Sequence, residues 1–125
     1  MSGRVVHFEL PVDDIERAQG FYREAFGWDI NSLPDMGYAL IGTTPSGDNG
    51  PTGPGAINGG MLTRQDPVRV PVITIEVDDI DAALKAVESL GGRIARAGLP
   101  VGDMGYAAYF TDTEGNVVGL WQNAG

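Results

Sequence analysis

The five residues Asp35-Met36-Gly37-Tyr38-Ala39 occur again, letter for letter, as Asp103-Met104-Gly105-Tyr106-Ala107. A shorter motif, Val12-Asp13-Asp14-Ile15, returns as Val77-Asp78-Asp79-Ile80. The second copy follows the first by 68 positions for the longer motif (from 35 to 103) and by 65 for the shorter one (from 12 to 77). Because both matches keep the same order, they indicate two copies of one supersecondary unit in a chain of 125 residues.

The first copy reads as a strand, a helix and three further strands. Residues 4–11 alternate apolar and polar side chains with the period of a strand. Asp13 or Asp14 can cap a helix that runs to about residue 26, where Gly27 ends it. The Gly- and Pro-rich stretch 45–55 is predicted to be a loop. The remaining strands are predicted near 28–33, 37–44 and 56–63.

The second copy repeats this plan. A strand at 72–77 precedes a helix that Asp79 caps and Gly91-Gly92 ends, and strands follow near 93–97, 105–111 and 117–122. We therefore predict one α+β domain over residues 1–125. It should contain two tandem βαβββ units that form a curved eight-stranded mixed sheet with its helices outside. The predicted boundaries are 4–63 for the first unit, 64–70 for a linker and 71–123 for the second unit.

Composition narrows the class of protein. Hydrophobic residues make up 42% of the chain and charged residues 20%, as in ordinary soluble domains. Cysteine is absent, which excludes disulfides, thiol nucleophiles and thiolate metal sites. The net charge of −9 disfavours nucleic acid as a partner. No apolar run is long enough for a membrane span, and the first residues lack the pattern of a signal peptide, so we expect a cytoplasmic protein.

Three segments resemble the vicinal oxygen chelate superfamily, and the resemblance covers essentially the whole chain. They are His7-Phe-Glu-Leu-Pro-Val-Asp-Asp-Ile-Glu-Arg-Ala18, Phe21-Tyr22 with Phe26-Gly27-Trp28, and Asp112-Thr-Glu-Gly-Asn116. That superfamily includes glyoxalase I, extradiol dioxygenases, fosfomycin-resistance proteins and bleomycin-binding proteins. The resemblance implies the glyoxalase/bleomycin resistance/dioxygenase fold. It leaves function open, because the superfamily places isomerases, lyases, transferases, oxygenases and binding proteins on one scaffold.

The resemblance also implies where metal ligands would stand. Metal-dependent members offer one ligand on the first strand and one on the last strand of each unit. His7 matches the first of these positions, whereas the other three hold Val72, Gly60 and Gly119. Since a catalytic zinc site needs three protein ligands, we expect no family-type metal and no cofactor. A site improvised from His7, Glu9 and Glu76 is the less favoured alternative.

His7, the one histidine of the chain, and Glu9 are the leading candidates for polar groups of a site. Being two residues apart on a strand, they project from the same face about 7 Å from each other. They can contact a ligand or exchange protons, or they can form a structural pair. Trp121 is expected beside Gly119 on the concave face, where it could form an amphipathic wall with Tyr38 and Tyr106. Each aromatic residue could instead fill the core. The whole predicted ligand-binding set is His7, Glu9, Tyr38, Met61, Thr74, Met104, Tyr106 and Trp121.

Three functions are compatible with this pattern. The leading hypothesis is a metal-independent protein of the glyoxalase/bleomycin-resistance type that binds a small organic ligand, with the acidic chain favouring a cationic or amine-bearing molecule. The second is a lyase, isomerase or dioxygenase that uses His7 and Glu9 as catalytic acid and base, with or without a rearranged metal site. The third is a partner-binding domain whose concave cup is vestigial. Many relatives pair across a two-fold axis, so we expect a homodimer.

Overall fold

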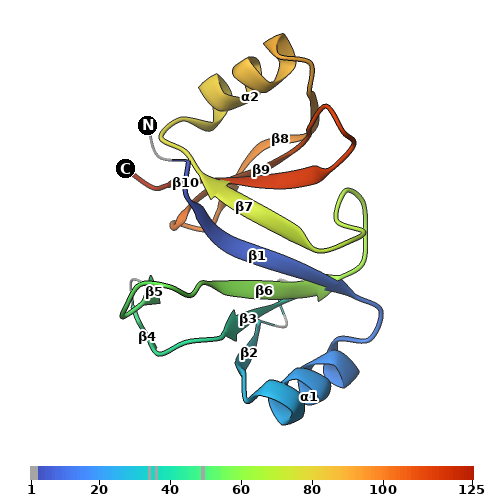
Figure 1. Cartoon of the computed structure of the whole chain (residues 1–125), viewed down its shortest axis with the longest axis vertical. Helices are drawn as coiled ribbons and strands as arrows, with labels where there is room; N and C mark the ends of the chain where they lie inside the picture. The colour runs from blue at the N-terminus through green and yellow to red at the C-terminus, as the bar shows by residue number, and fades with distance from the viewer. Residues whose placement is uncertain (1–2, 34, 36, 49) are drawn as a thin grey trace. The chain divides into compact units, whose positions relative to one another are not determined.

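A computed structural model describes residues 3–33, 35, 37–48 and 50–125, so Met36 of the repeated motif lies outside the described residues. The chain divides into a first unit, residues 7–71, and a second unit, residues 1–6 with 72–125, and each is described by itself. The described part of each unit forms one α-helix and a four-stranded mixed sheet (Figure 1). The predicted α+β class with two βαβββ repeats is therefore confirmed. No helix among the described residues is long and apolar enough to cross a membrane.

The first unit follows the predicted order of elements. Its strands lie in the order β2-β3-β6-β1, with β6 parallel to β1 and the other neighbours antiparallel. Asp14 accepts a hydrogen bond from the backbone N–H of Arg17 at the start of the helix, and Gly27 ends it with a left-handed φ of 71°. The elements are β1 (Val5–Val12, whose first two residues are counted with the second unit), α1 (Ile15–Phe26), β2 (Asp29–Leu33), β3 (Tyr38–Gly42) and β6 (Asn58–Thr63).

The core of the first unit lies between its sheet and α1. The helix contributes a stripe centred on Ile15, Ala18, Gln19 and Tyr22, and the amide of Gln19 donates a hydrogen bond to Ser32 Oγ at 2.8 Å. Phe21, at the edge of that stripe, stays 61% exposed. The fully buried side chains of the sheet are Ile30, Ala39, Ile41 and Met61.

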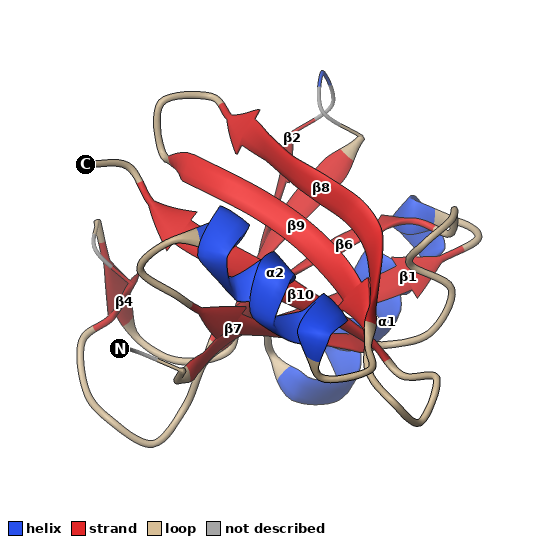
Figure 2. Ribbon diagram, turned by 90° about the horizontal axis from the view of Figure 1, so that it is seen from above, coloured by secondary structure: helices blue, strands red, loops and turns tan. Residues whose placement is uncertain are grey.

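The second unit has the same plan. Its strands lie in the order β7-β10-β9-β8, with β10 parallel to β7. Figure 2 shows α2 lying across this sheet, where Ile80 and Leu84 meet Ala108 and Leu120 in a buried cluster. The first strand of the chain also joins this unit, since the backbones of Arg4 and Glu76 are hydrogen-bonded. The elements are β7 (Val72–Glu76), α2 (Ile80–Ser89), β8 (Arg93–Val101), β9 (Gly105–Thr111) and β10 (Val117–Asn123).

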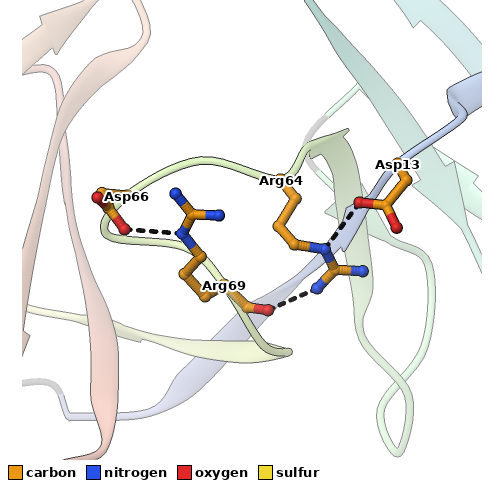
Figure 3. Close-up of polar contacts among 4 residues, drawn as sticks. All are labelled: Asp13, Arg64, Asp66 and Arg69. Carbon is orange, nitrogen blue, oxygen red and sulfur yellow. Dashed lines mark hydrogen bonds and ion pairs between the residues drawn. The ribbon is translucent and has the colours of Figure 1, made fainter.

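Two connecting segments of the first unit carry more structure than predicted. The stretch 45–55 contains a small antiparallel pair, β4 (Ser46–Gly47) and β5 (Gly50–Pro51), which corrects the prediction of a plain loop. After β6, Arg64 donates from Nε to Asp13 Oδ1 at 3.0 Å, and Arg69 donates from Nε to Asp66 Oδ1 at 2.7 Å (Figure 3). The Arg64–Asp13 pair joins the segment that follows β6 to the residues just before α1, whereas the Asp66–Arg69 pair lies within the segment.

The repeated five-residue motif lies one residue out of register between the two units. In the first unit Tyr38 stands opposite Leu62, two residues beyond Gly60. In the second unit the residue two beyond Gly119 is Trp121, and it stands opposite Ala107. Tyr106 is instead opposite Gln122, on the other face of its sheet. A shift of one residue reverses the direction of every side chain in a strand, so the two tyrosines are not structural equivalents.

Candidate functional site

One face of the first unit's sheet carries its polar residues. Glu9 stands opposite Gly60, and Gly60 stands opposite Leu40, so these positions in β1, β6 and β3 share a face. His7 and Tyr38, each two residues away along its own strand, lie on that same face. The alternate residues point the other way, toward α1 and the core.

The hydroxyl of Tyr38 joins His7 to Glu9. Its Oη lies 2.9 Å from Nε2 of His7, and it donates a hydrogen bond to Oε2 of Glu9 at 2.9 Å. A phenol carries a single proton, and here that proton is directed to Glu9. Nε2 of His7 must therefore be the donor in the other bond. We call His7, Tyr38 and Glu9 the polar triad.

Gly60 provides the space in which Tyr38 lies. A Cβ atom built on Gly60 would overlap the hydroxyl and ring of Tyr38. Any side chain at position 60 would therefore displace the tyrosine from between His7 and Glu9. The lack of a side chain at position 60 and the position of the Tyr38 hydroxyl above it are therefore linked.

Burial sets the protonation state of the triad's histidine. Glu9 is only 7% exposed, and His7 and Tyr38 are half-buried. Burial lowers the pKa of His7 below its ordinary value, because an imidazolium would lose hydration, and the nearby charge of Glu9 opposes this only in part. His7 is therefore neutral at pH 7.

Met61 does not belong to this face. It stands opposite Leu10 and Ala39, alternates with Gly60 and is fully buried in the core beneath α1. The expectation that Met61 lines a ligand wall with Tyr38 is corrected, because the strand period of two places neighbouring residues on opposite faces.

The second unit holds the other predicted site residues. Thr74 is the counterpart of Glu9; it is 7% exposed and stands opposite Gly119. Trp121 shares the face of Gly119, as predicted, and donates from Nε1 to Asn123 Oδ1 at 2.8 Å. Met104 is 61% exposed just before β9.

Tyr106 is placed differently from the prediction. It is 44% exposed and shares the face of Ala108 and Leu120, which pack against α2. The prediction of an aromatic wall containing Trp121 and Tyr106 together is corrected, because these two side chains leave their sheet on opposite faces.

The donors present do not fit a family-type metal. Within the described residues no group of three or more His, Cys, Asp or Glu side chains gathers where it could hold an ion. Glu76, the third member of the improvised site, has its carboxylate engaged by Arg4 at 3.1 Å and by Asn123 Nδ2 at 3.1 Å. The polar triad itself offers one imidazole, one phenol and one carboxylate, and Tyr38 is hydrogen-bonded to the other two.

An open hollow of about 340 Å³ lies at another place in the first unit. Along β3 it begins at Gly42, four residues or about 13 Å from Tyr38. Asp29 is its one ionisable side chain, and no member of the polar triad lines it. We place the candidate site at the triad, because the triad combines burial, a shifted pKa and convergent polar atoms.

Sequence reasoning identified His7, Glu9 and Tyr38 but missed the bridge that Tyr38 makes. A signal for it does exist: a glycine at a position where the family carries a large ligand leaves space that an aromatic residue on the neighbouring strand can fill.

Comparisons with known proteins agree with this architecture. The family model described as "Bleomycin resistance protein-like N-terminal" matches residues 4–44. A glyoxylase-like domain-containing protein of Didymella fabae is 30% identical, covering 93% of this chain and 91% of its own length. The ethylmalonyl-CoA/methylmalonyl-CoA epimerase of Cereibacter sphaeroides is also 30% identical, covering 80% of each chain.

A further sequence relative and a solved structure are also similar to this chain. The glyoxylase candidate CFP32 of Mycobacterium tuberculosis is 33% identical over 91% of this chain, which spans only 43% of that protein's length. The solved methylmalonyl-CoA epimerase of Streptomyces coelicolor superposes with a TM-score of 0.68 at 20% identity, covering 99% of this chain and 96% of the epimerase, and so shares the fold. The repeat, the two units and these relatives lead to one conclusion: the chain belongs to the vicinal oxygen chelate superfamily, among its glyoxalase-like and bleomycin-resistance-like members.

Proposed function

We propose that this chain binds a small organic molecule on the polar face of its first unit and does so without a family-type metal. One observation carries the proposal: the Tyr38 hydroxyl lies between His7 and Glu9, above Gly60. His7, which matches a ligand position of metal-dependent relatives, is here bonded to the hydroxyl of a phenol. The face thus offers a ready-made polar patch for an organic ligand.

The surroundings of the triad favour an organic ligand with an apolar part. Leu40 is 45% exposed on the same face, and Leu62 stands opposite Tyr38. Pockets for small molecules commonly combine such apolar surface with a few convergent polar groups. The net charge of −9 and the carboxylate of Glu9 favour a ligand that carries positive charge.

Metal content and thermal shift together test this proposal. Protein grown in metal-supplemented medium and purified without chelator should contain well below one equivalent of any divalent metal per chain. A ligand that binds the folded state raises the unfolding temperature, since it adds RT ln(1 + [L]/Kd) to stability. A panel of aromatic amines, cationic drugs and neutral aromatic compounds should contain stabilising molecules.

Two variants separate binding at the triad from binding elsewhere. His7→Gln should abolish the shift produced by any hit. Tyr22→Phe is the matched control, because Tyr22 packs beneath the sheet against Trp28 with ring centroids 4.7 Å apart. A stoichiometric metal, or hits that His7→Gln leaves unchanged, would contradict the proposal.

A second candidate is an enzyme that removes a proton from its substrate. The observation that favours it is the neutral imidazole of His7, which is bonded through Tyr38 to a carboxylate. Relatives include the epimerase of Cereibacter sphaeroides, and a solved epimerase holds methylmalonyl-CoA. Incubation with methylmalonyl-CoA in heavy water, followed by mass spectrometry, should show deuterium at the α-carbon if the chain is such an epimerase. Deuterium uptake no faster than in a protein-free control would exclude methylmalonyl-CoA as the substrate.

The homodimer and the cytoplasmic location remain predictions. Sedimentation equilibrium of the purified chain measures the first of them.

A further inference from the structure

Nδ1 of His7 keeps a hydrogen-bonding capacity that the protein does not use. Nε2 carries the proton that is donated to Tyr38, because the tyrosine directs its own proton to Glu9. A neutral imidazole has one N–H and one bare nitrogen, so Nδ1 of His7 is an acceptor with a free lone pair. The triad therefore fixes the tautomer of the imidazole.

The lone pair on Nδ1 of His7 is not used by another described group of the protein. Among the residues the structure describes, His7 has no polar contact beyond those with Tyr38 and Glu9. No buried side-chain nitrogen or oxygen of the described residues lacks a hydrogen-bond partner. Since Nδ1 has no partner there, it is not fully buried, and this leaves it open to a donor from a ligand.

We propose that the site recognises a primary or secondary ammonium group, whose N–H donates a hydrogen bond to Nδ1 of His7 while Tyr38 and Glu9 hold the imidazole in the tautomer that accepts it. This inference rests on the proposed function and names the class of ligand. In this arrangement His7 contacts the ligand, and Tyr38 and Glu9 are positioning residues.

Charge supports an ammonium over a neutral donor. The imidazole of His7 is uncharged at neutral pH and does not repel a cation, and the carboxylate of Glu9 lies one phenol away. A quaternary ammonium carries the same charge but has no N–H. It can therefore be attracted by the charge of Glu9, but it cannot donate a hydrogen bond to Nδ1 of His7. Only the primary or secondary ammonium can donate a hydrogen bond to Nδ1, and this difference distinguishes it from the quaternary ammonium.

A pair of matched probes tests the proposal. Benzylammonium and benzyltrimethylammonium share a ring and a charge and differ in the N–H donors. Titration calorimetry at pH 7.5 should show benzylammonium binding at least tenfold more tightly to the native chain. In Tyr38→Phe the preference should fall to about twofold or less, because the imidazole is no longer held in one tautomer. Tyr22→Phe, a change beneath the opposite face of the same sheet, should leave the preference intact.

Nitrogen-15 NMR of the single histidine gives a readout that is independent of binding. The native chain should show a protonated Nε2 and a bare Nδ1, Tyr38→Phe should show a mixture of tautomers, and Tyr22→Phe should match the native chain. A protonated Nδ1 in the native chain would overturn the proposal.

The outcomes separate this inference from the function on which it rests. Equal affinity for the two probes overturns recognition of the N–H and leaves small-molecule binding in place. Absence of binding by both probes at millimolar concentration overturns the ammonium class, and the thermal-shift panel with neutral compounds then decides whether the proposed function survives.

Discussion

The two units carry the same five-residue motif and use it differently. In the first unit the tyrosine of the motif bridges an imidazole and a carboxylate above Gly60. In the second unit the motif is displaced by one residue, its tyrosine lies on the α2 face, and Trp121 passes over Gly105 and bonds to Asn123. Identical letters therefore do not imply identical positions, because strand pairing decides which face each side chain occupies.

The largest difference in stability between the units should come from Met61 and Met104, which were both predicted to contact a ligand. Met61 is fully buried beneath α1 and Met104 is 61% exposed. Met61→Ala should lower the free energy of unfolding by about 3 kcal/mol, because it leaves a cavity in the core. Met104→Ala should change it by less than about 0.5 kcal/mol. Urea denaturation measures both, and similar losses would contradict the placement of Met61.

The second-largest difference between the units should come from adding a methyl group to the equivalent glycines, Gly60 and Gly119. Gly60→Ala should lower the free energy of unfolding by about 2 kcal/mol, since Tyr38 must leave its place and lose its hydrogen bonds to His7 and Glu9. Gly119→Ala should cost less, about 1 kcal/mol, because its nearest neighbour is the Thr74 hydroxyl, 2.9 Å from the added atom. The NMR signal of His7 should change in Gly60→Ala alone.

Removing one hydroxyl from each copy of the motif is a finer comparison. Tyr38→Phe leaves His7 and Glu9 without their shared partner and should cost about 1–2 kcal/mol. Tyr106→Phe removes a half-exposed hydroxyl and should cost less than about 0.5 kcal/mol. Equal effects in chemical denaturation would mean that the register shift has no energetic consequence.

The smallest expected effect is a pH dependence confined to the first unit's histidine. Its folded pKa is lowered from 6.5 by burial, against the nearby charge of Glu9 on the same strand; β3 contributes Tyr38, and β6 contributes the uncharged Asn58 opposite His7. As the pH falls, His7 is therefore protonated at a higher pH in the unfolded chain than in the folded chain. Stability is fully present above about pH 6.5 and declines as the pH falls toward the folded pKa.

His7→Gln should lose this slope between pH 6.5 and 5 in denaturation profiles. The lowered pKa values of Asp66 and Asp112 act in a lower window, below about 3.8, and do not interfere. An unchanged slope in His7→Gln would show that another group titrates there.

Much of the fold could be predicted from the sequence, because strand and helix periods are local. The helix at 15–26 was predicted to begin after Asp13 or Asp14 and to end near residue 26, from a capping aspartate and a stop glycine, and the structure selects Asp14. The strand at 105–111 was predicted with the observed limits. Strand β8 runs to Val101, beyond the predicted residue 97, through two irregularities in its pairing with β9 that no local pattern reveals.

The site was predicted in part for the same reason. His7 and Glu9 share a strand, so their common face follows from a spacing of two residues. The places of Tyr38 and Tyr106 depend on which residue of one strand stands opposite which residue of another, and that register is set by packing between distant segments. The error for Met61 was local, because Met61 follows Gly60 on the same strand and so faces the other way. The repeated letters suggested equal registers, and the structure shows a shift of one.

The overlap between a side chain at position 60 and the ring of Tyr38 has an evolutionary consequence. A single substitution such as Gly60→Glu, which would return a ligand of the family type to β6, meets the tyrosine before it can meet a metal. Substitutions that place a metal ligand on β6 therefore have an order, with a smaller residue at position 38 first and a ligand at position 60 second. We expect the two positions to be coupled, so that the glycine and the tyrosine are lost or kept together among the relatives of this chain.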